Sequence, residues 1–368
     1  MELTIHNFNL CPTHSQFILF ARSLLSSSGY TELSDFAEKQ ITSKKFYIIH
    51  DDDSILVFNI GTLENGVFLC SNYPDTHLKL RKSSYNSPDN IICCDSAPGM
   101  NIRSWLNREL KLAGKVLCKT SNGKEVKSYC STVPVSFIPY GNTSEEISLQ
   151  DLKPVFVAGN DGIASKDTVK SIVSQDLKIE MDDIIDMDLD LIDSREISRI
   201  GQELIAGQSI DGTCSSICTL ESFLKSEEPT NGFKCLISFN GNIENIFSCI
   251  LQKIGITAEI LQKSILINIE NYGTNCLEEG ILIFRHSQDL VQSVFLHDVI
   301  DKYHIKAKDI RTLKQNKQLV EMPSIHIGIP IQNIGDIREL SLVNNIVFLE
   351  DAIKYSVNEW FSFGGCEF

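Results

Sequence analysis

Three acidic residues at one-residue spacing, Asp186, Asp188 and Asp190, form the most regular pattern of potential ligands in the sequence. The same spacing opens the calcium loop of an EF-hand, where carboxylate oxygens coordinate the ion. That loop also needs glycine at its sixth position and glutamate at its twelfth, and here these are Leu191 and Ile197. Apolar residues alternate with the acids in a period of two, so we interpret the run as a solvated strand face.

Cysteine and histidine show no spacing typical of a metal site. The 12 cysteines contain no CxxC pair, and Cys214 and Cys218 lie four residues apart on a predicted helix. The cysteines in apolar, strand-like runs fit reduced thiols in a core: Cys70, Cys93, Cys94, Cys118 and Cys235. Among the histidines that show no ligand spacing, His326 in SIHIGIP is the one that we retain as a candidate site residue. A GxSxG elbow and a phosphate-binding glycine loop are also absent from the sequence.

The overall charge excludes two classes of partner. The chain has 368 residues, a net charge of −15 and a pI near 5.0. Nucleic-acid binding needs clustered Lys and Arg, and an anionic membrane surface would repel this chain, so we expect neither partner. No run of about 18 apolar residues could cross a bilayer, and the first residues lack the pattern of a secretory signal. We therefore expect a cytoplasmic protein.

The elements that must position any site alternate between helix and strand. A helical pattern in HSQFILFARSLL precedes the strand patterns KFYIIH, SILVFNIG and GVFLCS, and the second half of the chain again alternates the two. Short strand patterns and a charged, helix-like or turn segment, SWLNRELKLAG, lie between these parts. The fold class predicted is α/β, a mostly parallel or mixed sheet flanked by helices and interrupted by a β-rich insertion. The boundaries expected are 1–82 with 198–368 for the α/β domain, and 83–197 for the insertion.

Several strings in the same order resemble the aspartyl aminopeptidase family of cytosolic two-zinc exopeptidases. SWLNRELKLAGKVLCK is similar to the family's WFDRDLGLAGRV, which opens its dimerisation domain. ELIAGQSIDGTCSSICTLESFL resembles the helix that bears the family's RLDN motif, and HIGIPIQNIGDIREL resembles its closing GIP and MHSxRE motifs. The resemblance implies the zinc-aminopeptidase fold and an activity that removes acidic N-terminal residues.

The family's mechanism implies a strict set of residues, and this sequence replaces most of them. Two zinc ions need a bridging carboxylate, and each also needs a histidine and a further carboxylate, with a glutamate beside them as general base. Asp211 matches the bridging aspartate, and Glu270 matches a further carboxylate with a longer side chain. The replaced positions are Asn72 and Gly335 for the two histidines, Asn242 for the general base and Ile243 for the adjacent glutamate ligand. Only Asp211 and Glu270 keep the chemistry of a metal ligand, as vestiges.

Three alternatives remain open at these positions. Asp75 and His77 could supply an Asp-x-His pair if the strand end slipped in register. Glu244 could take the place of the second glutamate if the alignment shifted by one residue. Asp211 could persist for a structural reason, as a carboxylate beside the N–H groups of a helix start.

The sequence therefore predicts a divergent, catalytically impaired or inactive member of this family that acts in binding, assembly or regulation. We expect no cofactor, and a homo-oligomer formed through the insertion or co-assembly with an active paralogue. The alternative is an active aminopeptidase that removes acidic N-terminal residues with altered ligands, and zinc would then be its cofactor.

Overall fold

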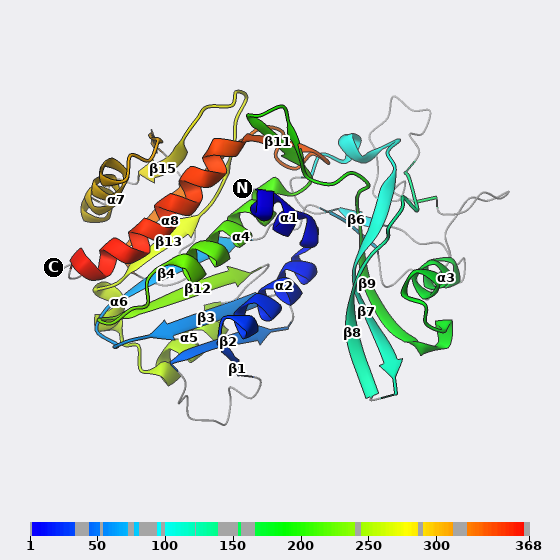
Figure 1. Ribbon diagram of the computed structural model, residues 1–368, viewed down its shortest axis with the longest axis horizontal. Helices are drawn as coiled ribbons and strands as arrows, with labels where there is room; N and C mark the ends of the chain where they lie inside the picture. Colours follow the sequence, from blue (N-terminus) through cyan, green and yellow to red (C-terminus); the bar gives the residue numbers. More distant parts are fainter. Residues whose placement is uncertain are drawn as a thin grey trace.

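A computed structural model describes residues 2–33, 44–51, 54–72, 77–80, 94–96, 100–121, 123–138, 154–155, 166–239, 244–285, 290–311 and 322–363. Figure 1 shows two bodies side by side, a large sheet with its helices and a smaller, upright sheet. No helix in these described residues is long and apolar enough to cross a bilayer.

The large body is built on a nine-stranded mixed sheet. Its strands, in spatial order, are β1 (Thr31–Glu32), β2 (Lys45–His50), β3 (Ser54–Ile60), β12 (Phe233–Phe239), β4 (Gly66–Asn72), β13 (Ile265–Ile269), β17 (Ser324–Gly328), β15 (Ile281–Arg285) and β16 (Ala307–Arg311). The four central strands, β12, β4, β13 and β17, are mutually parallel, whereas β3 and β15 flank them in the antiparallel sense. The carboxyl ends of the central strands therefore meet at one edge of the sheet.

Helices cover both faces of this sheet. One face carries α1 (Glu2–Leu10), α2 (His14–Ser27), α4 (Ile210–Lys225), α7 (Leu290–Lys302) and α8 (Val343–Phe363), and the other carries α5 (Glu244–Ile254) and α6 (Ala258–Gln262). Alternate residues of β4 enter the two cores, with Leu69 on the α4 side and Phe68 on the α5 side. Burial on both faces explains why the central strands are almost continuously apolar.

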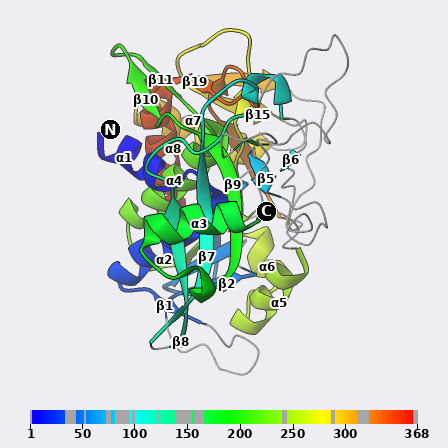
Figure 2. The same ribbon diagram turned by 90° about the vertical axis from the view of Figure 1, so that its right-hand side faces the viewer.

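The smaller body is a five-stranded sheet in the order β6 (Cys94–Ser96), β5 (Leu78–Leu80), β9 (Ile184–Asp193), β7 (Leu110–Thr120) and β8 (Gly123–Cys130). Helix α3 (Lys166–Leu177) packs Val169 and Val173 onto it, and Figure 2 shows this helix in front of β7 and β9. Gly114 has φ +142°, and a Cβ built there would lie 2.2 Å from the Asp188 carbonyl oxygen. Glycine at this position therefore permits the close approach of β7 and β9.

Short elements complete the molecule and link its two bodies. They are the 3₁₀ turns η2 (Ile102–Trp105) and η4 (Met181–Asp183), the three-stranded sheet β10 (Ser198–Ile200), β11 (Leu204–Gly207) and β19 (Glu339–Leu342), and the pair β14 (Tyr272–Gly273) and β18 (Pro330–Ile331). The gap between the bodies is bridged by Gln16 of α2, whose Nε2 donates to the carbonyl of Tyr129 on β8.

The predicted α/β class is confirmed, and two local predictions are wrong in part. The charged segment SWLNRELKLAG, predicted to be helix-like or a turn, holds the end of η2 and a turn, but from Leu110 onward it belongs to β7. Asp190 is buried, whereas Asp186 is exposed and Asp188 is intermediate, so the run is a solvated strand face only in part. The proposed division into 1–82 with 198–368 and 83–197 stays a prediction, although β5, within the first of these spans, pairs in the smaller sheet.

Candidate functional site at the carboxyl edge of the large sheet

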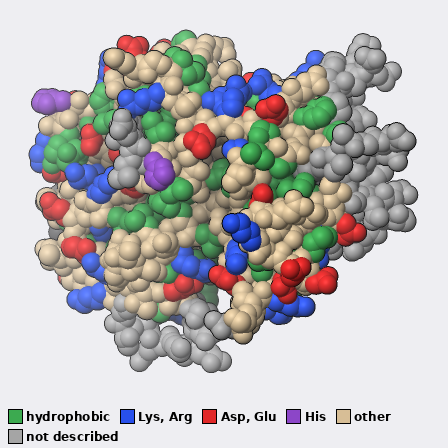
Figure 3. All heavy atoms as spheres, turned by 45° about the vertical axis from the view of Figure 1, so that its right-hand side comes forward, with side chains coloured by type: hydrophobic (Ala, Val, Ile, Leu, Met, Phe, Trp, Pro, Cys, Tyr) green, Lys and Arg blue, Asp and Glu red, His purple; other side chains and the backbone are tan. Residues whose placement is uncertain are grey.

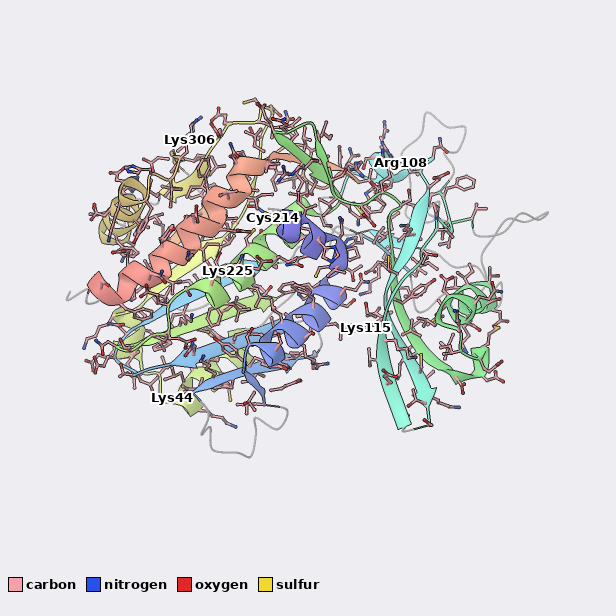
Figure 4. The ribbon with its side chains drawn as sticks, in the orientation of Figure 1. Lys44, Arg108, Lys115, Cys214, Lys225 and Lys306 are labelled. Carbon is pink, nitrogen blue, oxygen red and sulfur yellow. The ribbon has the colours of Figure 1, made fainter. Side chains whose placement is uncertain are left out.

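Of the residues singled out by the sequence, Asn72, Glu270 and Asp211 lie at the edge where the central strands end. Asn72 is the last residue of β4 and pairs with Phe239, the last residue of β12. Ser71 pairs with Ile269, so Glu270 follows β13 directly beside Asn72. Helix α4 starts at the same edge with Asp211 in its first turn, and Figure 4 labels Cys214 just beyond it.

Asp211 is held by a side chain that the sequence analysis did not consider. The Nδ2 of Asn271 donates to the Asp211 carbonyl at 2.9 Å and to its Oδ1 at 3.1 Å, and it also lies 2.8 Å from the Ser215 hydroxyl. The Oδ1 of Asn271 accepts from the N–H of Ile329 at 3.0 Å, which ties the site to the end of β17. One carboxylate oxygen of Asp211, the residue that matches the family's bridging aspartate, is therefore already hydrogen-bonded to an amide.

Glu339 caps the helix that carries Asp211. Its Oε2 accepts the N–H of Asp211 at 2.8 Å, and its Oε1 accepts the N–H of Gly335 at 3.1 Å. The cap residue of α4, Ser209, has a left-handed φ of +50° and makes no side-chain cap bond, so the buried glutamate supplies the acceptor instead. The acceptor for the N–H groups at the start of α4 is therefore the carboxylate of Glu339, whereas the sequence had suggested Asp211 for this role.

Burial and mutual repulsion make both carboxyl groups weaker acids than usual. Burial raises the pKa of Asp211 to about 6, with the charge of Glu270 adding to the rise and the Asn271 hydrogen bond opposing it. Burial raises the pKa of Glu339 to about 8, and the charge of Asp211 adds to this rise. The backbone N–H groups of Asp211, Gly335 and Ile210 oppose the rise at Glu339.

The carboxylate of Glu270 lies beside a buried histidine, His326. Its Oε2 is 3.5 Å from the Nδ1 of His326, whose Nε2 lies 3.3 Å from the Nδ2 of Asn268. The register that pairs Asn268 with His326 places both on the α5 side of the sheet, and Glu270 follows two residues later. His326, kept open by the sequence, is therefore a buried neighbour of Glu270.

Within the described residues, the remaining predicted positions add no metal-ligand group to Asp211 and Glu270. Gly335 has no side chain and a φ of +83°, a conformation in which a histidine would be strained. Asn72 ends β4, but its side chain, like the whole of Asn242 and Ile243 and the side chain of Glu244, lies outside the described part of the chain. His77 is buried with its Nε2 3.2 Å from the Ser209 hydroxyl, whereas Asp75 is outside the described residues.

The donors that the structure describes do not form a dinuclear zinc centre. Within the described residues, no group of three or more His, Cys, Asp or Glu side chains could hold a metal ion. A zinc site takes at least three protein ligands, and a pair of zinc ions takes more. Asp211 and Glu270 are two carboxylates, and each already contacts a neighbouring side chain.

Comparisons of the sequence with known proteins identify relatives of this chain. The family model for Aminopeptidase I zinc metalloprotease (M18) matches residues 8–246. A probable M18 family aminopeptidase 2 from Pseudomonas fluorescens is 24% identical over 259 residues, which are 65% of this chain and 59% of that protein. The aspartyl aminopeptidase of Caenorhabditis elegans is 22% identical over 239 residues, 55% of this chain and 51% of that protein. The matched segment thus spans about 59% of the length of the first of these relatives.

Solved structures extend the likeness of the fold to almost the whole chain. The crystal structure of yeast aminopeptidase 1 (Ape1) superposes with a TM-score of 0.82 at 18% identity, covering 98% of this chain and 97% of that one. The M18 aminopeptidase from Thermotoga maritima gives a TM-score of 0.75 at 14% identity and covers 97% of this chain and 95% of that one. At these identities the likeness concerns the fold alone. The family match over residues 8–246, together with this shared fold, confirms the resemblance: the chain belongs to the M18 aminopeptidase family.

Proposed function

We propose that this chain is a non-catalytic member of the M18 family that uses the family fold for binding and assembly. The observation that carries the proposal is the hydrogen bond between Asn271 and the Oδ1 of Asp211, which engages the matched bridging carboxylate with an amide. Gly335, at a matched histidine position, adds a backbone conformation unsuited to a side chain.

The chemistry of the family supports this proposal. Two-zinc hydrolysis needs a metal-bound water, a base to deprotonate it and a metal to polarise the carbonyl. Asparagine at 242 cannot take up the proton, and isoleucine at 243 offers no lone pair to a metal. The residues that remain can bind and orient a polar ligand through Asp211, Glu270 and His326, but they lack the donors that would activate water.

Metal content and peptidase activity test the proposal together. Purified protein would be equilibrated with zinc, freed of loosely bound metal, and measured by mass spectrometry of the metal and by release of N-terminal Asp or Glu from peptides. We expect no stoichiometric zinc and no release above that of the Asp211→Asn variant. About two zinc ions per chain, with release that Asp211→Asn abolishes, would contradict the proposal.

A second candidate is an active metal-dependent aminopeptidase for acidic N-termini with altered ligands. The observation that favours it is the imidazole of His326 beside Glu270, a nitrogen donor near the matched carboxylates. In that case His326→Asn would lower the zinc content and the peptide release together. Under the first proposal the same variant changes neither quantity, so the pair of measurements separates the two candidates.

We further propose that the chain works in the cytoplasm as a homo-oligomer, or co-assembled with an active paralogue, through the unit 83–197. A related yeast structure is titled as the mApe1 dodecamer. In the present chain, β8 pairs only with β7 among the described strands, and Val126 on β8 is 44% exposed. An open strand edge that carries exposed apolar residues is suited to pairing with another chain.

The oligomer can be tested by changing the exposed edge. Val126→Asp should dissociate the assembly in sedimentation velocity, because a charge would be buried at the interface. Val133→Asp is the matched control, since Val133 is 59% exposed but lies outside β8. A monomeric unmodified protein, or equal dissociation by both variants, would contradict the assembly through β8.

A further inference from the structure

A cleft lies at the junction of the two bodies, away from the carboxylates of the candidate site. Figure 1 shows α1 and α2 facing β7 and β8 at this junction. The junction cleft is small, with a volume of about 70 Å³, and it is open to solvent on one side. It is lined by Phe8, Asn9, Pro12, Lys111, Cys130, Ile192, Asp193, Ser194, Arg195, Glu196, Ile197 and Gln208.

Hydrogen bonds between the two bodies fix the walls of the junction cleft. The Nδ2 of Asn9 donates to the Ile197 carbonyl at 3.0 Å, and its Oδ1 accepts the N–H of Ile197 at 2.8 Å. The carboxylate of Asp193 is 2% exposed and accepts from the Nη1 of Arg338 at 2.8 Å and from the N–H of Arg195 at 3.1 Å. The acid at the base of the cleft is thus already neutralised, and the cleft is preformed.

Lys111 brings a positive charge to the cleft without a protein partner. Its ammonium makes no ion pair or hydrogen bond within the part of the chain that the structure describes. The side chain is half-buried on β7. Burial raises the pKa of the nearby Cys130 thiol above its usual value, and the positive charge of Lys111 opposes part of that rise. In Figure 4, the labelled Lys115 marks the same strand beside α2.

Gln208 brings a hydrogen-bond donor that also lacks an acceptor. The residue is 7% exposed, and its Oε1 accepts the N–H of Asp193, which fixes the orientation of the amide. Its Nε2 is buried and has no hydrogen-bond partner among the described residues. A buried donor left unsatisfied costs about 1–3 kcal/mol, so such a group in a cleft indicates a missing acceptor.

We propose that the junction cleft binds a small carboxylate with a short apolar body, its carboxylate accepting from Lys111 and Gln208. One unpaired cation and one neutral donor match a single negative charge. A phosphate, with nearly twice that charge, would also face the exposed carboxylate of Glu196. The apolar body would rest on Pro12, Ile192 and Ile197.

The test uses hexanoate and hexanamide as probes of the full chain, followed by ligand-observed NMR. We expect hexanoate to bind with a Kd on the order of 1 mM, as suits a ligand of so few atoms, and hexanamide to bind at least about tenfold more weakly. A second pair, acetyl-Ala-Leu with a free or an amidated carboxyl group, distinguishes a peptide C-terminus from a free acid as the source of the carboxylate.

Two variants and one control locate the binding. Lys111→Met removes the charge, and Gln208→Glu keeps the acceptor for Asp193 while removing the free donor. Each should raise the Kd of hexanoate at least about tenfold. Lys119→Met, on the exposed part of the same strand, should leave it unchanged. Equal binding of the acid and the amide, or unchanged binding in Lys111→Met and Gln208→Glu, would overturn the proposal.

Discussion

Replacement of Arg338 by leucine tests the contact that locks the two bodies together. The guanidinium is 20% exposed, and its Nη1 donates to the Oδ2 of Asp193 at 2.8 Å. Its Nη2 donates to the carbonyl of Ala206 at 3.0 Å, so the side chain joins the ends of β9, β11 and β19. Arg338→Leu keeps the apolar stem and removes every donor.

The structure gives the expected size of the effect. Removal of one partner from a buried ion pair costs about 3–5 kcal/mol, because the other charge stays buried and uncompensated. The N–H of Arg195 remains within 3.1 Å of Asp193 and its Nε within 3.5 Å, which favours the lower end of that range. We therefore expect Arg338→Leu to lower the free energy of unfolding by about 3 kcal/mol.

Urea unfolding followed by fluorescence measures this loss in both bodies. The two tryptophans are buried, Trp105 beside the five-stranded sheet and Trp360 on α8, so each body carries its own reporter. Lys302→Leu is the control, because its ion pair with Glu359 is 58% exposed on the lysine side and solvent screens it, so its removal should change the free energy of unfolding little. The reasoning would be refuted if Arg338→Leu cost no more than this control. It would also be refuted if Arg338→Leu and Asp193→Asn were additive in a double-mutant cycle.

Three further predictions concern the metal site, the pH dependence and the backbone. Asn72→His combined with Asn271→Ala, which frees Asp211 from its amide partner, should supply three ligands together with Glu270 and create a zinc site detectable in a chelator competition, whereas Asn72→Gln combined with Asn271→Ala should not. Burial lowers the pKa of Lys234 to about 8, so the unfolded chain holds this proton more tightly. Stability should therefore rise from pH 8 to about 10.5, by up to about 3 kcal/mol relative to Lys234→Met, in paired urea titrations. Gly114→Ala should cost at least about 2 kcal/mol in thermal unfolding, and Gly123→Ala, which meets nothing within 4 Å, about 1 kcal/mol.

Local patterns were enough to predict much of the framework. The period of apolar residues predicted α2 and α4 and the strands β2, β3 and β4, because the spacing of apolar residues follows from which faces of a helix or strand are buried. It did not predict β15 and β16, which complete the sheet beyond β17. The error at Asp190 has a similar cause, since whether a side chain on a strand face is covered depends on segments remote in sequence.

The sequence by itself determined which side chains stand at the matched ligand positions, and hence that Asn72 and Gly335 cannot serve as histidines. Only the tertiary structure decided what the surviving carboxylates contact. Glu339, which caps the helix of Asp211, is 128 residues away along the chain, and Asn271, which holds its carboxylate, is 60 residues away. Residue type fixes what a group can donate or accept. Which partner it meets follows from the packing of distant segments, because folding brings together groups that no local pattern connects.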